Sequence, residues 1–401
     1  MVRLRSGRAL DWLNFFVANV QTGFGPFVAV YLTTQAWTDV EIGFALSIGT
    51  ATMMLAQVPA GLLVDATPRK RLVAMLAMIA IALSAILLAA LPGRLPVIGA
   101  EVLHGIASCV LTPAVAAISL ALVGRARLGE RLGRNARYAS LGSGIAAAIM
   151  GSAGAWFSGA SVFWLTAALM VPGLLALASI SAGDLHPGPV VPVAPKSGLP
   201  GGAIRSLLLE RGVLVFAACC LLFTLANAAM LPLVGAEITR VAGDEANLVI
   251  AACIVVPQLV VAAISPWVGR LAERRGRRLV LMLGFAALPL RGVLLSVVSD
   301  PLGLAAVQAL DGISAAVLGV LLPLLAADLT RGSNRFNLCM SLFGLAVGIG
   351  GTISTTLAGG ITTWFGSGAA FGVLAGCGFL AFLLVAFGMP ETREAPAVRP
   401  A

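Results

Sequence analysis

Charged residues are scarce in this sequence: they make up 11% of its 401 residues, whereas 59% are hydrophobic. A soluble protein of this length would need more charged side chains to cover its surface. The sequence contains neither a Gly-x-x-x-x-Gly-Lys phosphate-binding loop nor a nucleophile elbow. Too little chain lies outside the apolar runs to form a catalytic domain. These absences exclude a membrane-embedded enzyme and an ATP-driven pump, so we predict no catalytic residue and no cofactor.

Metal-ligating residues are also few. The chain has two histidines, and all six cysteines fall within apolar runs. Such cysteines are interpreted as small packing residues rather than as disulfide or zinc ligands. We therefore predict no metal site.

What the sequence does have is long apolar runs, and its mean hydropathy is +1.00. A helix needs about 20 apolar residues to cross a bilayer. Lipid offers the backbone no hydrogen-bond partners, so these runs should be helices. The first is too long for a signal-peptide core, and we expect it to be retained. We predict an all-α membrane protein with twelve transmembrane helices, near residues 11–34, 42–64, 72–91, 95–122, 138–158, 161–181, 213–236, 246–268, 279–298, 302–327, 337–362 and 367–388.

The net charge of +9 could indicate a nucleic-acid partner, but the distribution of the basic residues indicates a membrane. With the first residue placed inside, nearly all of the 26 basic residues fall in cytoplasmic segments. Arg94 and Arg240 lie in outer loops, and Arg291 lies within a span. This is the positive-inside pattern, so we predict that both termini are cytoplasmic and that the protein resides in the inner (cytoplasmic) membrane.

A repeated loop shows that the chain is a duplication. The segment from Gly61 to Leu72 and the segment from Gly269 to Leu279 follow the same plan: a glycine, an acid four residues later, then a basic cluster. We predict two pseudo-symmetric six-helix bundles, residues 1–181 and 213–401. A Pro- and Gly-rich cytoplasmic linker, residues 182–212, should join them.

Two titratable residues stand out in the first half. Glu101 and His104 are three residues apart in the fourth span, so they share a helix face. His104 should lie roughly 15 Å beyond Arg94, near the middle of the hydrocarbon core. A carboxyl and an imidazole at that depth are costly and indicate function by default. The alternative is that they form a structural pair.

Polar residues recur at equivalent places in the second half. The dipeptide that begins at His104 corresponds to one that begins at Asp311, and Arg291 should lie at a similar depth to Asp311. The spacing therefore allows an ion pair, which we interpret as structural. Amide side chains also lie within the spans, where they normally face a bundle interior or a cavity. The candidate cavity-lining amides are Asn19, Gln21, Asn227 and Gln308.

The repeated loop resembles the signature of the major facilitator superfamily, and the resemblance covers essentially the whole chain. That signature reads Gly, three variable residues, Asp, basic, variable, Gly, Arg and a further basic residue. The first copy departs from it at Ala66 and Pro68. Its matching residues are Gly61, Asp65, Arg69 and Lys70.

The second copy has Glu273 where the family has aspartate. Its matching residues are Gly269, Arg274, Gly276, Arg277 and Arg278. The fourth span lacks the arginine motif of many proton-driven members, and the fifth lacks the proline of drug:proton antiporters. The chain is similar to uncharacterised bacterial members, which indicates no substrate.

The resemblance implies a secondary transporter that binds a small organic solute near the midplane and exposes it by alternating access. The cavity should be lined by the first, fourth, seventh and tenth helices, which carry the polar residues named above. We expect Glu101 or Asp311 to carry a coupling proton, because a low-dielectric cavity favours a neutral carboxyl. We expect His104 either to tune that equilibrium or to bind substrate. Asp65 and Glu273 should cap a neighbouring helix or pair with arginines in one end state. The expected partners are a solute, protons and the lipid bilayer; we expect a monomer.

Two alternatives remain open from the sequence. One is a transport-inactive relative that acts as a sensor or scaffold, and the other is a proton-independent uniporter. With one acidic residue in each half and only Arg291 as a counter-charge, a neutral or cationic solute is favoured over an anion. Import and export are not distinguished.

Overall fold

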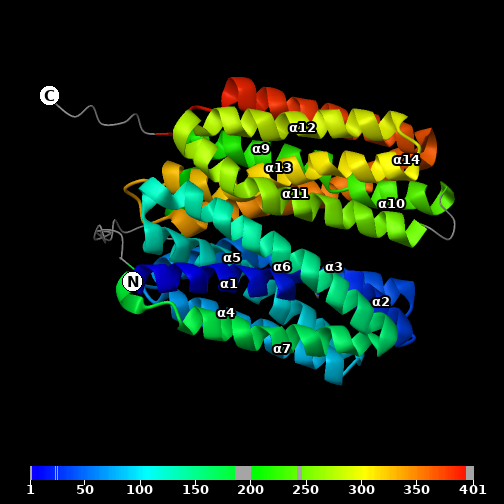
Figure 1. Ribbon diagram of the computed structural model, residues 1–401, viewed down its shortest axis with the longest axis horizontal. Helices are drawn as coiled ribbons and strands as arrows, with labels where there is room; N and C mark the ends of the chain where they lie inside the picture. Colours follow the sequence, from blue (N-terminus) through cyan, green and yellow to red (C-terminus); the bar gives the residue numbers. More distant parts are fainter. Residues whose placement is uncertain (1, 23, 25, 186–199, 242–245, 394–401) are drawn as a thin grey trace.

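The computed structural model describes residues 2–22, 24, 26–185, 200–241 and 246–393. All regular structure in these residues is helical. The helices run side by side along the longest axis of the molecule, which forms an elongated bundle (Figure 1). Helices α1 to α7 form the lower part of the bundle in that view, and α9 to α14 form the upper part.

The first half begins with two helices where one span was predicted. A break around Phe24 separates them, and the first is polar at its beginning. A capping box between Thr38 and Glu41 starts the third helix. The helices of this half are α1 (Val2–Thr22), α2 (Pro26–Thr34), α3 (Asp39–Ala66), α4 (Lys70–Ala90), α5 (Arg94–Val123), α6 (Leu128–Trp156) and α7 (Gly159–Ala178).

The second half contains the longest helix of the described chain, which covers the last two predicted spans. It bends at Gly366, whose φ of +83° suits only glycine. Asp300 caps α13 and is followed by a proline at the first helical position. Its helices are α9 (Arg211–Asn227), α10 (Met230–Val241), α11 (Ala246–Arg275), α12 (Arg277–Val297), α13 (Pro301–Leu329) and α14 (Phe336–Gly388). A further short helix, α8 (Pro200–Leu208), lies within the predicted linker of residues 182–212.

Nine helices in the described residues are long and apolar enough to cross a membrane, by length and composition alone. The 53-residue α14 counts once although it covers two predicted spans. The first predicted span is split between α1 and α2, and the apolar part of α6 is rich in Gly and Ser. These three features account for the difference from the twelve predicted spans.

Each half has its own buried core. Phe163 and Met78 are buried in the first half, and Phe216, Phe285 and Phe343 in the second. The halves meet where α3 packs against α14 and where α6 packs against α11. The division at residues 181 and 213 stays a prediction.

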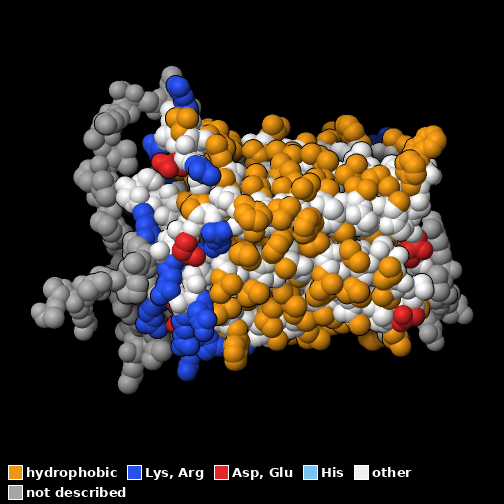
Figure 2. All heavy atoms as spheres, turned by 90° about the horizontal axis from the view of Figure 1, so that it is seen from above, with side chains coloured by type: hydrophobic (Ala, Val, Ile, Leu, Met, Phe, Trp, Pro, Cys, Tyr) orange, Lys and Arg blue, Asp and Glu red, His pale blue; other side chains and the backbone are white. Residues whose placement is uncertain are grey.

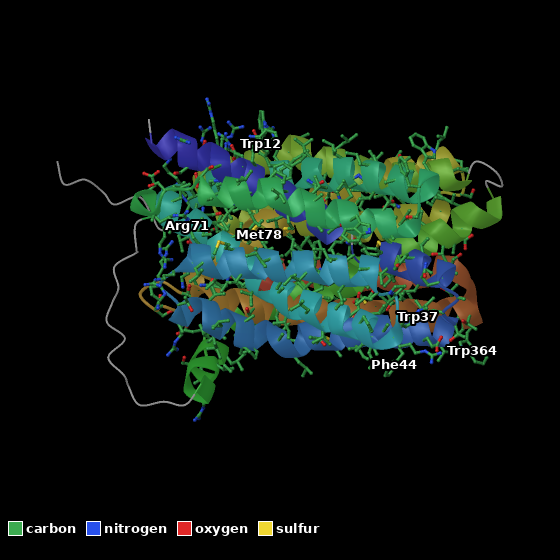
Figure 3. All side chains as sticks on the ribbon, turned by 90° about the horizontal axis from the view of Figure 1, so that it is seen from below. Trp12, Trp37, Phe44, Arg71, Met78 and Trp364 are labelled. Atoms are coloured by element: carbon green, nitrogen blue, oxygen red, sulfur yellow. The ribbon has the colours of Figure 1, made fainter. Side chains whose placement is uncertain are left out.

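The outer surface is apolar over most of its length, and the space-filling view shows hydrophobic side chains covering it (Figure 2). Large side chains such as Leu55 and Trp364 are about four-fifths exposed, as expected of residues that face lipid. Trp364 lies near one end of the bundle, and Trp12 lies further in, towards the other end (Figure 3). Tryptophan is enriched at both membrane–water interfaces, so these residues mark the approximate limits of the apolar band.

Basic side chains gather at one end of the molecule (Figure 2). We call this end, where α1 begins and where α3 and α11 end, the basic end; its residues include Arg5, Arg69, Arg127, Arg270 and Arg275. The beginning of α1 and the end of α14 lie there (Figure 1).

Candidate functional site

A buried arginine organises the polar residues of the second half. Arg291, on α12, is 1% exposed. Its Nη1 donates to Asp311 Oδ1 at 2.8 Å and to Asn227 Oδ1 at 2.5 Å, and its Nη2 donates to Gln308 Oε1 at 2.5 Å. The guanidinium therefore connects α12 to the end of α9 and to α13. We call these four residues the Arg291 cluster: Arg291, Asp311, Asn227 and Gln308.

The sequence explains this geometry. Gln308 and Asp311 are three residues apart on α13, so they share a face, and a planar guanidinium presents several donors in a fixed fork. A charge in the middle of a membrane helix needs a partner, and the carboxylate of Asp311 supplies one. The Arg291 cluster is neutral as a whole when both groups are ionised. The sequence predicted only the pairing with Asp311 and missed the part that Asn227 and Gln308 play in it.

Glu101 lies in a different environment, between α5 and α3. Its side chain is close to Gly49, where an added Cβ would collide with the carboxyl group. Glu101 is 7% exposed, and its Oε1 has no hydrogen-bond partner in the described residues. No ion pair joins Glu101 to a cation of the described chain. It is a buried carboxyl group without a counter-charge in that part of the chain.

His104 faces another neighbour. Its ring stacks on Phe24 at the break between α1 and α2, with centroids 3.7 Å apart and planes 5° apart. Its Nε2 lies 3.1 Å from Ser108 Oγ. Glu101 and His104 make no hydrogen bond to each other among the described contacts. Although they share a helix face, their side chains contact different neighbours.

The cavity candidates divide into two groups. Asn227 and Gln308 meet at Arg291, as described. Asn19 is buried, but its side chain donates to Phe15 O in its own helix at 2.9 Å. The side chain of Gln21 lies outside the described residues.

The first copy of the repeated loop connects the two halves. Asp65, at the end of α3, accepts hydrogen bonds from the backbone N–H of Asn337 at 3.0 Å and of Leu338 at 2.9 Å. These groups open α14, where backbone N–H groups have no partner within the helix. Gly61 lies against Ser341, so α3 and α14 approach closely. Lys70 donates to the carbonyl of Val64, and Arg69 is exposed.

The second copy makes the reverse connection. Glu273 accepts from the backbone N–H of Glu130, near the beginning of α6, at 3.0 Å. Gly269 packs directly on the carbonyl of Gly129, with no room for a side chain. Each half thus extends an acid to the start of a helix in the other half.

The remaining residues of the second copy bind within their own half. Arg277 pairs with Asp328 at 3.0 Å, and Arg278 donates to the carbonyl of Ala386. Gly276 has a φ of +102°, which requires glycine. The backbone carbonyl of Arg274 accepts from Arg393 at 2.6 Å.

Sequence reasoning missed two buried ion-pair groups near the basic end. Asp11 on α1 pairs with Arg131 and Arg134 on α6, and Asp328 pairs with Arg277. The sequence feature that could have predicted these ion pairs is the position of each aspartate, which lies in or at the end of an apolar run and close to a basic loop. These pairs fix helix ends within each half.

Comparisons with known proteins agree with this architecture. The sequence model of the Major Facilitator Superfamily matches residues 10–244 and 214–401. Two uncharacterized MFS-type transporters of Mycobacterium tuberculosis, from strains CDC 1551 and H37Rv, are each 36% identical over 407 residues, covering 97% of this chain and 94% of theirs.

Solved structures share the fold at low identity. The E. coli fucose:proton symporter FucP in its outward conformation superposes with a TM-score of 0.74 at 15% identity, covering 98% of this chain and all of that one. The human organic anion transporter MFSD10 gives 0.70 at 15% identity, covering 96% and 99%. The predicted family, the all-helical membrane fold and the absence of an enzymatic role are confirmed. The chain belongs to the Major Facilitator Superfamily and is a multi-pass membrane transporter.

Proposed function

We propose that this transporter is a proton-coupled secondary carrier of a small neutral or cationic organic solute. The observation that carries the proposal is a pair of carboxyl groups in spanning helices, one in each half: Glu101 is buried and Asp311 is partly buried. Glu101 has no counter-charge among the described residues, and Asp311 shares Arg291 with two amides. Such groups are costly in lipid and are functional by default.

The two carboxyl groups would carry protons in different ways. An ionised carboxylate without a partner is strongly disfavoured in an apolar interior, so Glu101 would be neutral when enclosed and could ionise when exposed to water. Protonation of Asp311 would break its ion pair, while Arg291 would keep the oxygens of Asn227 and Gln308 as acceptors. Proton binding at Asp311 would therefore weaken the contact between α13 and α12, while Arg291 would still have two hydrogen-bond acceptors.

The charge of the core supports a neutral or cationic solute. Arg291 is 1% exposed and engaged with three oxygens, so no cationic side chain is free to bind an anion in the described residues around it. Glu101 adds an acidic group that no described cation neutralises. An anionic solute would meet net repulsion there.

The contacts at the basic end support alternating access. We place this end, with both termini, at the cytoplasmic face of the inner membrane because of the positive-inside rule. The bonds of Asp65 and Glu273 then hold the cytoplasmic side closed. Breaking them would let the halves rock apart, and we propose that one chain does this as a monomer.

The experiment is proton flux in proteoliposomes challenged with a broad panel of neutral, cationic and anionic solutes. A solute that dissipates an imposed pH gradient through wild type, and not through Asp311→Asn, supports coupled transport and identifies a solute class. The sign of proton movement separates symport from antiport. Solute uptake without proton movement would indicate a uniporter. If no solute of the panel causes proton movement or is taken up by protein that is shown to be folded, a transport-inactive sensor or scaffold would be favoured.

A further inference from the structure

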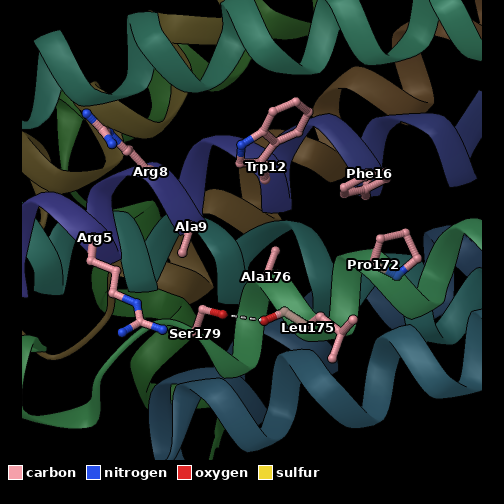
Figure 4. A pocket seen from close by; sticks show the side chains of 9 residues that line it. All are labelled: Arg5, Arg8, Ala9, Trp12, Phe16, Pro172, Leu175, Ala176 and Ser179. Atoms are coloured by element: carbon pink, nitrogen blue, oxygen red, sulfur yellow. Dashed lines mark hydrogen bonds between the residues drawn. The ribbon is translucent and has the colours of Figure 1, made fainter.

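A groove opens on the outer surface between α1 and α7 at the basic end. It is a shallow, open depression of about 330 Å³ and is lined by residues of both helices. Arg5 and Arg8 lie at its entrance on α1, Trp12 and Phe16 continue along the same helix, and Pro172 lies opposite on α7 (Figure 4). The groove belongs to the first half alone and contains no residue of the Arg291 cluster.

The charge of the groove is unbalanced. Arg5 and Arg8 are exposed, and neither makes a hydrogen bond or an ion pair with a described residue. The acids nearby are engaged elsewhere: Asp11 pairs with Arg131 and Arg134, and Asp184 accepts from Ser6 at 2.6 Å. Two positive charges, one helical turn apart, therefore flank the groove, Arg5 on the α7 side of α1 and Arg8 on the other side, without a counter-ion from the described part of the chain (Figure 4).

Below the arginines the groove is apolar. The ring of Trp12, which is 51% exposed, stacks on Phe16 with centroids 6.0 Å apart. Pro172 and Leu175 form the other wall, and Leu175 is 64% exposed. A tryptophan between a charged end and an apolar surface is typical of the membrane–water interface. The groove thus pairs a cationic entrance with an apolar floor in the direction of the bilayer core.

We propose that this groove binds an anionic phospholipid, with its phosphate at Arg5 and Arg8 and one acyl chain along Trp12, Phe16 and Pro172. Arginine binds phosphate through parallel N–H groups, which suits the headgroup. A soluble anion would use the arginines but leave the apolar floor exposed to lipid or water. A zwitterionic phospholipid would bring a cation beside the two arginines. The site requires only the membrane fold and is independent of proton coupling.

The test uses Trp12 as the reporter. The full chain is reconstituted in phosphatidylcholine vesicles that contain a rising fraction of brominated phosphatidylglycerol or of brominated phosphatidylcholine, and quenching is measured. The contribution of Trp12 is the difference between wild type and Trp12→Phe. Because a basic residue near the surface favours anionic lipid about fivefold, we expect phosphatidylglycerol to be preferred by about fivefold or more.

Two variants test the groove independently. Arg5→Gln with Arg8→Gln should abolish the preference. Ala176→Leu should reduce it with both arginines in place, because the larger side chain fills the lining. The matched control is Arg270→Gln on α11, where the guanidinium lies 5.5 Å from the exposed ring of Trp267 but outside this groove; it should leave the preference unchanged.

Three results would overturn the proposal. They are equal quenching of Trp12 by the two brominated lipids, a preference that survives both groove variants, and a preference that soluble glycerol phosphate removes. The last result would assign the arginines to a soluble anion instead of a lipid.

Discussion

The backbone N–H of Leu338 donates a hydrogen bond to Asp65 Oδ2 at 2.9 Å, although 273 residues separate the two in the chain. The second carboxylate oxygen of Asp65 accepts from Asn337. One acid in the first half thus satisfies two N–H groups at the start of α14. Glu273 makes the reverse contact with α6, so the basic end is closed by two reciprocal caps.

We expect Asp65→Asn to slow turnover and to leave solute binding nearly unchanged. The amide offers one oxygen in place of two, so at least one N–H of α14 loses its acceptor, and a lost cap costs about 0.5–2 kcal/mol. The measurement is turnover and binding of the solute found by the proteoliposome panel.

Asp300→Asn is the control for this substitution. Asp300 caps its own helix, α13, through one oxygen, which asparagine can replace. A large loss of solute binding in Asp65→Asn, or an equal effect of Asp300→Asn on turnover, would contradict the role of Asp65 in closing the basic end.

Gly133→Ala should open the basic end. A Cβ at Gly133 on α6 would collide with the carbonyl oxygen of Ser265 and lie 3.0 Å from Pro266 Cα on α11. Such overpacking costs about 1–3 kcal/mol, and it applies only while α6 and α11 are together. Spin labels at the exposed positions Arg127 and Arg275, in a chain without native cysteines, should report a longer distance.

Gly151→Ala is the matched control on the same helix, because no described atom lies within 4 Å of an added Cβ there. It should leave the spin-label distance unchanged. An unchanged distance in Gly133→Ala would show that the contact between α6 and α11 does not depend on close approach.

Arg291→Gln should destabilise the protein strongly. It leaves the carboxylate of Asp311 without a cation, and breaking a buried ion pair costs about 3–5 kcal/mol. Adding Asp311→Asn removes the unpaired charge, so the double variant should recover much of the lost stability. The measurement is thermal unfolding in detergent.

The exposed pair of Arg94 and Glu41 supplies the control for this comparison, because exposed ion pairs contribute little. Arg94→Gln should therefore unfold near the wild-type temperature. A double variant less stable than Arg291→Gln alone would show that charge balance is not what holds the Arg291 cluster together.

Glu391 gives a pH dependence outside the membrane. Burial raises the pKa of Glu391, but N–H groups of Arg277, Arg393 and Arg278 more than offset this and hold the pKa below its usual 4.5. A carboxyl with a lowered pKa stabilises the folded state above the unfolded pKa, and this contribution is lost as pH falls through the folded value. The wild type should therefore lose more thermal stability than Glu391→Gln as the pH falls from 6 to 3.

Glu210→Gln serves as the control for the pH experiment, because Glu210 precedes α9 without a side-chain cap bond. Its pH profile should follow the wild type. If the thermal stability of wild type and of Glu391→Gln depends on pH in the same way, Glu391 does not contribute to stability against acid.

The sequence was sufficient for the fold because lipid leaves few alternatives. A long apolar run must be a helix, and the repeated loop at Gly61 and Gly269 predicted a duplication. Depth along a helix was also predictable, since rise per residue is fixed. That is why the positions of Arg291 and Asp311 in the chain were enough to place them at similar depth.

Rotation and packing partners could not be predicted in the same way. Whether Asn227 and Gln308 face Arg291 depends on how α9, α12 and α13 are turned against one another. Glu101 and His104 share a helix face by spacing, yet one lies against Gly49 and the other against Phe24. The motif left open whether Asp65 caps a helix or pairs with arginines, and only tertiary packing shows that it caps α14.

The most direct test of proton coupling compares two modes of transport in the same proteoliposomes. One is solute accumulation driven by an imposed pH gradient, and the other is solute exchange without a gradient. We expect Asp311→Asn or Glu101→Gln to lose proton-driven accumulation and to retain exchange, because the solute site can still alternate when the proton site cannot ionise. If both variants accumulate solute as the wild type does, neither carboxyl carries the coupling proton and the central claim is wrong.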